Sequence, residues 1–231
     1  MEPTILALDT SAGSCSVACL RGGRVAAEKY ECLARGHAEA VVPMVASVMA
    51  DSGLRYDQLD AIAVTIGPGT FTGIRIGLAA ARGLALASSR PMVGITTLEA
   101  IAHGAQANKR SVLVLLDARK GQLYAQLFDW TLKPVAPPSV LATQNIRSLK
   151  PSGQYIVAGT GVALARPHLL AATVPEDDII FDTGAGFPRA AIVARIASTR
   201  EPRPPTTIRP LYLRAPDAVF PPVVGGGSSR V

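Results

Sequence analysis

The stretch from Ser111 to Asp129, "SVLVLLDARKGQLYAQLFD", repeats the layout of an earlier stretch, "TILALDTSAGSCSVACLRG", which runs from Thr4 to Gly22. Each holds an apolar run, an aspartate, a turn of four residues that ends near a glycine, and a second run typical of a strand. When the aspartates Asp9 and Asp117 are superimposed, the glycines of the two turns coincide without a gap. The two stretches therefore predict an internal duplication.

Similar elements are expected after each of these stretches. The pair Gly22-Gly23 predicts a hairpin into a third strand that ends at about Cys32. Repeated meanders with alternating helices and strands favour an α/β fold in which two lobes, residues 1–108 and 109–218, face each other across a cleft. A flexible tail, residues 219–231, is expected to follow. Further strands are predicted at residues 61–66, 91–95 and 155–158, and helices at 37–51, 73–87, 97–107, 161–170 and 187–198.

Composition limits the function classes. The 231 residues are 48% hydrophobic, which is enough for a sizeable core, and the net charge of +6 permits contact with nucleic acid or an acidic partner. The arginines are scattered, with little aromatic interleaving, so the sequence predicts no dedicated RNA-binding stripe. The three cysteines favour reduced core residues. Since no signal pattern or membrane-spanning apolar run is found, we expect a cytoplasmic protein without a membrane contact.

The turn "DTSAGS", from Asp9 to Ser14, offers a carboxylate and three hydroxyls. Hydroxyl and backbone N–H groups in such a turn can hold phosphate, and the aspartate can hold a hydrated Mg²⁺. In the alternative interpretation, the polar side chains satisfy the backbone of their own turn. Asp117 at the same place in the second half favours an ancestral nucleotide cleft.

The turn "GPGTFTG", from Gly67 to Gly73, precedes a predicted helix whose N-terminus favours anions. It is not a Walker loop, because no lysine follows the last glycine. Alternatively, the glycines only shape the turn and Thr72 caps the helix. The candidate nucleotide- or phosphate-binding residues are Asp9, Thr10, Ser11, Ser14, Gly67, Gly69 and Asp117.

Catalytic and metal-binding motifs are not found. The histidines His37, His103 and His168 are far apart, and none has a second ligand at metal-site spacing. The Gly-x-Ser-x-Gly elbow of a serine nucleophile is also absent. The sequence therefore predicts neither catalytic residues nor a protein-made metal site.

Six stretches in the same order carry a resemblance that covers the chain up to about Ala218. They resemble the TsaB (YeaZ) family of tRNA threonylcarbamoyladenosine biosynthesis proteins. The resemblance implies an ASKHA-type (actin and sugar-kinase-like) fold with two ribonuclease-H-like lobes. The stretches are "ILALDTSAGSCSVACL", "GHAEAVVPMV", "AVTIGPGTFTGIRIGLAAARGLA", "GITTLEAIAHG", "DARKGQLYAQLF" and "RPLYLRAPDA".

The resemblance also implies a function. Members of this family are noncatalytic subunits that bind and activate the paralogue TsaD, which transfers threonylcarbamoyl to adenosine 37 of tRNA, and the ATPase TsaE joins the assembly. The chain itself is then expected to require no cofactor, whereas the complex uses ATP and Mg. We expect a homodimer when the chain is alone, tRNA contact only through the complex, and no stand-alone activity.

A comparison with the catalytic paralogue supports this division of labour. Its metal motif His-Leu-Glu-Gly-His corresponds to Thr97-Leu98-Glu99-Ala100-Ile101, so both imidazoles are missing. The alternatives are an independent ATP-dependent kinase or ATPase, and a metallopeptidase, which the missing ligands disfavour. The resemblance implies pairing through helices of the first lobe, and the candidate interface residues are Val41, Val42, Val45, Met49, Arg75, Leu78, Ala80 and Arg82.

Overall fold

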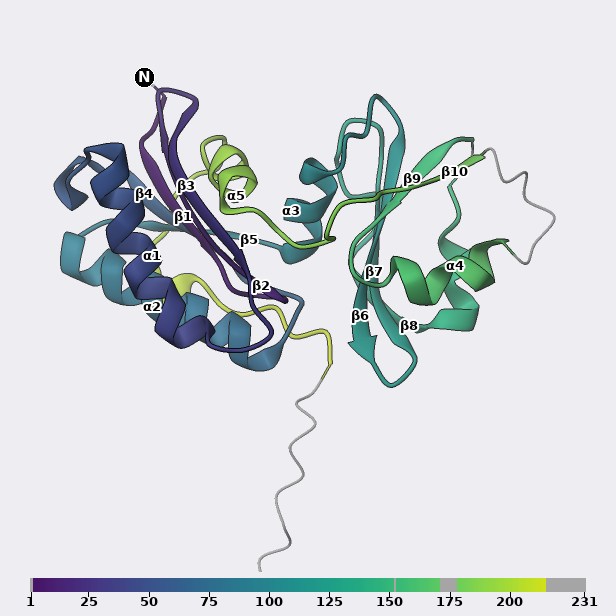
Figure 1. The fold of residues 1–231 in the computed structure, drawn as a ribbon. Helices are drawn as coiled ribbons and strands as arrows, with labels where there is room; N and C mark the ends of the chain where they lie inside the picture. Colours follow the sequence, from purple (N-terminus) through teal and green to yellow (C-terminus); the bar gives the residue numbers. More distant parts are fainter. Residues whose placement is uncertain (1, 152, 171–177, 215–231) are drawn as a thin grey trace, which may run out of the picture.

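The structure, a computed structural model, describes residues 2–151, 153–170 and 178–214. The tail expected from residue 219 onward lies outside the described residues. Two five-stranded sheets form two lobes that lie side by side, each with helices packed on it (Figure 1). No helix among the described residues is both long and apolar enough to cross a lipid bilayer.

The two sheets have the same strand order. In the first lobe the order is β3-β2-β1-β4-β5, and in the second it is β8-β7-β6-β9-β10. In each sheet the first three strands are antiparallel and the last two run parallel to the first. This repeat confirms the predicted duplication and the α/β fold with two similar lobes. The strands are β1 (Ile5–Asp9), β2 (Ser14–Arg21), β3 (Arg24–Cys32), β4 (Ala61–Thr65), β5 (Met92–Ile95), β6 (Ser111–Arg119), β7 (Gln122–Phe128), β8 (Ser139–Ala142), β9 (Tyr155–Ala158) and β10 (Ile179–Phe181).

The connection between the first two strands differs between the lobes. In the first lobe residues 10–13 link β1 to β2, as the sequence predicted. In the second lobe β6 continues through Arg119, and only Lys120 and Gly121 separate it from β7. The four-residue turn expected there is therefore wrong. Arg119 and Lys120 both have a positive φ, of 66° and 53°, which closes a tight hairpin.

The first sheet is covered on both faces because its strands alternate two apolar sets. Leu6 and Leu8 of β1 face helices α1 (His37–Ser52) and α2 (Phe71–Ser88). The alternate residues Ile5 and Ala7 face α5 (Ala190–Ala197), which follows the second sheet in the chain but packs on β1 and β2 of the first lobe. Helix α3 (Thr97–Gly104) makes the reverse crossing and packs on β6.

The second sheet carries α3 on one face. Its other face is covered by α4 (Val162–Leu170) and the 3₁₀-helix η2 (Thr143–Leu149). Two shorter 3₁₀-helices are η1 (Tyr56–Gln58) and η4 (Pro205–Thr207). The lobe boundary expected at residue 108 separates the strands of the two sheets, but α3 and α5 each cover the sheet on the other side of it.

The chain returns along the first lobe after α5. Arg203 exchanges two backbone hydrogen bonds of 2.8 Å with Met92 of β5, and Ile208 joins the core of the first lobe. The N–H of Leu211 then donates to the carbonyl of Ile66 at 2.7 Å. We call residues 203–214 the C-terminal strap. It brings the end of the described chain to the space between the lobes (Figure 1).

Candidate functional site

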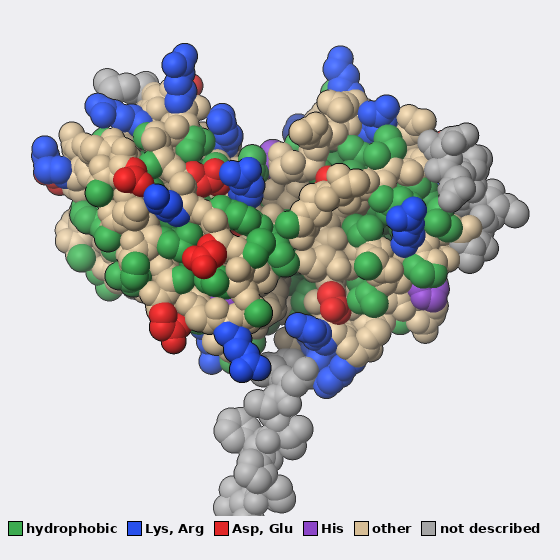
Figure 2. Space-filling view, in the orientation of Figure 1, with side chains coloured by type: hydrophobic (Ala, Val, Ile, Leu, Met, Phe, Trp, Pro, Cys, Tyr) green, Lys and Arg blue, Asp and Glu red, His purple; other side chains and the backbone are tan. Residues whose placement is uncertain are grey.

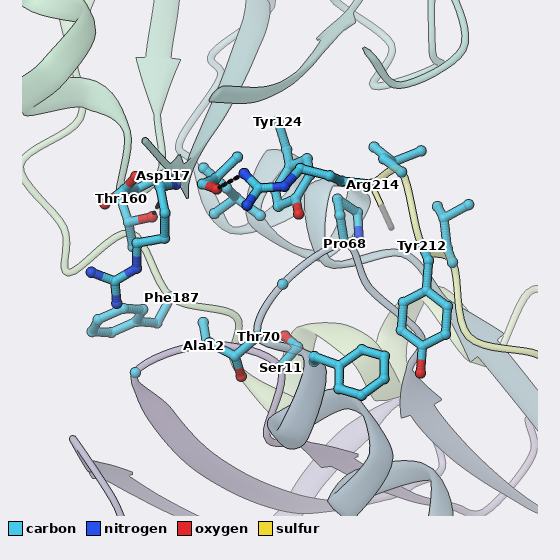
Figure 3. A pocket seen from close by; sticks show the side chains of 18 residues that line it. Ser11, Ala12, Pro68, Thr70, Asp117, Tyr124, Thr160, Phe187, Tyr212 and Arg214 are labelled. Carbon is cyan, nitrogen blue, oxygen red and sulfur yellow. Dashed lines mark hydrogen bonds between the residues drawn. The ribbon is translucent and has the colours of Figure 1, made fainter. Parts of the chain in front are cut away.

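A cleft of about 500 Å³ lies between the two lobes. Figure 3 shows the residues from the first lobe facing Asp117, Thr160 and Tyr124 of the second, with Phe187 and Tyr212 at opposite ends. Its walls are residues 11–13 and 68–71 of the first lobe, residues 116–119, Tyr124 and Thr160 of the second lobe, Phe187, and residues 211–214 of the strap.

Asp9 does not line this cleft, because its side chain is fully buried at the end of β1. Its Oδ1 atom accepts hydrogen bonds from the N–H of Ser11 (3.2 Å), the Oγ of Ser11 (2.6 Å) and the Oγ1 of Thr65 (2.6 Å). Burial raises the pKa of the Asp9 carboxyl, and the donors from Ser11 and Thr65 oppose this shift only in part. Asp9 therefore joins the first turn to β4. Of the two interpretations of this turn, the structure favours the one in which its polar side chains satisfy the turn itself.

The glycine-rich turn packs tightly against this first turn. The N–H of Thr70 donates to the carbonyl oxygen of Ser11 at 2.8 Å, and the Oγ1 of Thr10 donates to the carbonyl of Gly73 at 2.7 Å. A Cβ atom on Gly69 would lie 2.2 Å from the Ser11 carbonyl oxygen, and one on Gly73 would lie 2.1 Å from that of Thr10. The absence of side chains at these glycines thus allows backbone to pack on backbone.

The cap of α2 differs from the expected one. The Oγ1 of Thr70 accepts a hydrogen bond of 3.2 Å from the N–H of Gly73, so Thr70 is the N-cap and the helix begins at Phe71. Thr72, the expected cap, lies one position inside the helix and is exposed. The start at Phe71 places an aromatic ring, as well as the helix N-terminus, at the cleft wall.

The second lobe presents Asp117 differently from Asp9. Asp117 lines the cleft, and its Oδ1 accepts a hydrogen bond of 2.7 Å from the N–H of Arg119. The N–H of Asp117 donates to the Oγ1 of Thr160 at 3.2 Å. Because β6 extends two residues past Asp117, the turn beyond it has no hydroxyl cluster like that of the first lobe. The two aspartates occupy equivalent strand positions but do not form a facing pair of carboxylates.

The structure therefore brings only some of the predicted nucleotide-site residues to the cleft. Ser11, Gly69 and Asp117 line it, whereas Asp9, Thr10, Ser14 and Gly67 do not. The residues that sequence reasoning missed come from distant segments. One signal was present, since Gly159 and Gly161 flank Thr160 between β9 and α4 as glycines flank the turn before α2. The missed residues are Tyr124, Thr160, Phe187, Tyr212 and Arg214.

The positions that correspond to the paralogue's metal motif lie on α3. Thr97 is fully buried at the start of the helix, and Ile101 packs in the core between α3 and the second sheet. Glu99 forms an ion pair with Arg200, and its N–H donates to the Oγ1 of Thr96. Within residues 2–151, 153–170 and 178–214, no three His, Cys, Asp or Glu side chains gather in a way that could hold a metal ion.

The predicted interface residues divide into two groups. Val41, Val45, Met49 and Leu78 are only 2 to 4% exposed and belong to the core of the first lobe, so they must be removed from the candidate interface. The apolar spacing that suggested them marks the faces of α1 and α2 that pack on the sheet. Val42, in contrast, is 62% exposed.

The other interface candidates lie on α2. Ala80 is half-buried beside the core. Arg75 and Arg82 contact the C-terminal strap: Arg75 Nε donates to the Tyr212 hydroxyl at 3.1 Å, and Arg82 donates to the carbonyl of Ile208. The exposed residues of the two helices include Val42, Ala46, Ala79, Gly83 and Leu86.

Comparisons with known proteins agree with this architecture. The family model of TsaD, tRNA N6-adenosine threonylcarbamoyltransferase, matches residues 30–182. The tRNA threonylcarbamoyladenosine biosynthesis protein TsaB of Escherichia coli is 36% identical over 168 residues, which are 68% of this chain and 71% of that protein. The chain belongs to the TsaB (YeaZ) family. Membership gives it a role in the biosynthesis of threonylcarbamoyladenosine in tRNA.

Two further relatives extend the TsaB assignment over nearly the whole chain. TsaB of Bacillus subtilis is 28% identical over 220 residues, which are 93% of this chain and 96% of that protein. A solved structure of YeaZ from Pseudomonas aeruginosa is 29% identical and superimposes with a TM-score of 0.80, covering 91% of this chain and 100% of that chain. The two-lobed body is thus that of TsaB proteins from end to end of the described fold.

Proposed function

We propose that this chain is a noncatalytic scaffold subunit that activates a TsaD paralogue, together with the ATPase TsaE, for threonylcarbamoyl transfer to adenosine 37 of tRNA. The observation that carries the proposal is the chemistry of α3. Where the paralogue's motif has two imidazoles one turn apart, this chain has a buried threonine, Thr97, and a core isoleucine, Ile101. Neither side chain is a ligand that a catalytic divalent metal ion prefers.

The outward face of α1 and α2 supports a docking role. Val42 on α1 and Leu86 on α2 are 62% and 70% exposed. The exposed residues of the two helices also include the small residues Ala46, Ala79 and Gly83, which allow a partner helix to approach closely. This face is available to a paralogue with a similar lobe, or to a second copy of the chain when it is alone. Pairing of two related lobes through the same helices follows the isologous rule of twofold assemblies.

The alternative of an independent kinase or ATPase receives less support from the site. A phosphate-linked Mg²⁺ needs a carboxylate that faces the ligand, whereas Asp9 is fully buried and hydrogen-bonded to Ser11 and Thr65. Among the described residues that line the cleft, Asp117 is the one carboxylate. We therefore propose that ATP and Mg are used by the complex and that this chain requires no cofactor of its own.

Reconstitution tests the proposal. Purified TsaD, TsaE, ATP, threonylcarbamoyl-adenylate and unmodified tRNA are combined with and without this chain, and modified adenosine is quantified by mass spectrometry of nucleosides. Modification should depend on the chain, and the chain alone with ATP and Mg should neither modify tRNA nor hydrolyse ATP. Equal modification without the chain would contradict the proposed scaffold role. Mg-dependent ATP hydrolysis by the isolated chain, lost in Asp117→Asn, would favour the kinase or ATPase alternative.

A further inference from the structure

An aromatic and arginine cluster lies at the end of the cleft beside α2. The guanidinium of Arg75 lies over the ring of Phe71, with its Cζ atom 3.7 Å from the ring centroid. Its Nε donates to the hydroxyl of Tyr212, and the rings of Phe71 and Tyr212 are 5.2 Å apart at an angle of 33°. Tyr212 is 39% exposed, so the edge of this stack is open to solvent. We call these three residues the cleft-end stack.

The sequence could not reveal this cluster, because Tyr212 is 137 residues away from Arg75 in the chain. The C-terminal strap runs along α2 in the opposite direction, from Ile208 beside Arg82 to Tyr212 beside Arg75. The helix between these two arginines is about 10 Å long. Arg209, which is exposed, therefore lies on the strap within about that distance of the stack.

The two elements that form the stack carry arginines and no acidic residue. Helix α2 contains Arg75 and Arg82, and the C-terminal strap contains Arg203, Arg209 and Arg214, of which Arg203 lies at the far end of the strap, paired with Met92. Among the described residues, no ion pair joins Arg75 or Arg209 to a carboxylate. Figure 2 shows Lys and Arg side chains on both lobes at the lower end of the groove between them.

We infer that the cleft-end stack and the arginines around it bind single-stranded RNA. An unstacked base lies against the exposed Tyr212 ring, and a flanking phosphate lies against Arg209. The combination of aromatic faces, arginine planes and a basic groove is how proteins hold unpaired nucleotides. An acidic peptide would use the positive charge but would leave the aromatic stack without a role. This inference rests on the proposed function, in which the substrate is a tRNA, and gives this subunit a direct contact with it.

Fluorescence anisotropy tests the inference, with the chain alone and in complex with TsaD. The probes are a labelled RNA stem-loop with an unpaired loop and a blunt RNA duplex of equal length. The stem-loop should bind more tightly than the duplex. Tyr212→Ala should weaken stem-loop binding about tenfold or more, whereas Tyr212→Phe, which keeps the ring, should retain most of the affinity. Arg209→Ala should lower the slope of log affinity against log salt by about 0.7.

Arg24→Ala is the matched control. Arg24 is an exposed arginine at the hairpin between β2 and β3, at the opposite end of the first sheet from the turn at Asp9. This variant should bind the stem-loop like the unchanged chain. Size-exclusion chromatography with TsaD establishes for each variant that the complex still assembles.

Several outcomes would overturn the inference. Equal affinity for loop and duplex, or unchanged binding by Tyr212→Ala in an intact complex, would reduce the surface to a nonspecific basic patch. Competition by poly-glutamate at a strength equal to RNA, with Tyr212→Ala unaffected, would indicate a protein partner instead. These results are separable from failure of the proposed function, because RNA binding and TsaD assembly are measured without the transfer reaction.

Discussion

The Oγ1 of Thr65 donates a hydrogen bond of 2.6 Å to Oδ1 of Asp9, from the end of β4 to the end of β1. This bond and the two from Ser11 satisfy one carboxylate oxygen, while Oδ2 is buried and has no hydrogen-bond partner among the described residues. Burial of a carboxylate with one unsatisfied oxygen disfavours its charged form, and it raises the pKa of Asp9 although the donors from Ser11 and Thr65 oppose the shift. The carboxyl that the sequence suggested as a magnesium ligand thus acts as a structural tie.

Asp9→Asn should change the pH dependence of stability. Burial raises the folded-state pKa of Asp9 above its ordinary value of 3.8, so its contribution to stability is full below that value and is lost as pH rises through the folded-state pKa. Asn keeps an acceptor for Ser11 and Thr65 but cannot ionise. The variant's free energy of unfolding in urea, relative to the unchanged chain, should therefore rise from about pH 4 toward neutrality.

Asp9→Ala is the comparison for this experiment. It removes the acceptor from Ser11 and Thr65 and, relative to Asp9→Asn, which also cannot ionise, should lose about 1 to 3 kcal/mol at every pH. If Asp9→Asn and the unchanged chain followed the same pH profile, the carboxyl would not be the buried group that the structure shows.

Gly69→Ala should destabilise the chain by about 2 kcal/mol, because the new Cβ atom would lie 2.2 Å from the carbonyl oxygen of Ser11. Gly83→Ala is the control, since no atom lies within 4 Å of a Cβ at this exposed position of α2, and it should stabilise the helix by about 0.5 to 1 kcal/mol. Thermal unfolding measures both. A Gly69→Ala variant as stable as Gly83→Ala would show that the two turns are not packed backbone to backbone.

Val42→Glu should weaken pairing with TsaD or with a second copy while changing the free energy of unfolding by no more than about 0.5 kcal/mol, because Val42 is 62% exposed. Val45→Glu, three residues further along α1, should instead lose about 3 kcal/mol or more, because it buries a charge in the core. Ultracentrifugation and urea unfolding separate the two effects. Normal pairing by a folded Val42→Glu variant would exclude this face of α1.

Ellman's reagent should modify one thiol rapidly in the native chain. Cys32 is exposed, whereas Cys15 and Cys19 are buried, and burial raises the pKa of Cys15 to about 12. The second and third thiols should react only as the chain unfolds. Cys32→Ser should abolish the rapid phase, and a rapid phase that persists in this variant would contradict the core position of the other two cysteines.

The sequence predicted the fold well because its signals are local. Apolar runs, the aspartates Asp9 and Asp117 and the spacing of glycines give both strand units directly. The tight hairpin of the second lobe was missed because two residues that rarely take a positive φ, Arg119 and Lys120, do so there. Such a conformation depends on the surrounding sheet rather than on residue type.

The site was harder to predict than the fold. Helical spacing identifies an apolar stripe, as at Val41 and Val45, but it cannot tell whether the stripe packs on the chain's own sheet or on a partner. The cleft end was also hidden, because the contact between Arg75 and Tyr212 forms only when the strap returns along α2. Contacts of this kind depend on tertiary structure and leave no periodic pattern.

Because α3 and α5 each cover the sheet of the other lobe, the two halves of the duplicated chain depend on each other. A fragment that ends at residue 108 would lack α5 and would expose Ile5, Ala7 and their neighbours to solvent. The remaining fragment would lack α3, which covers one face of the second sheet. We therefore expect that neither half folds independently. The protein repeats one plan twice, yet each half depends on a helix of the other half to complete its core.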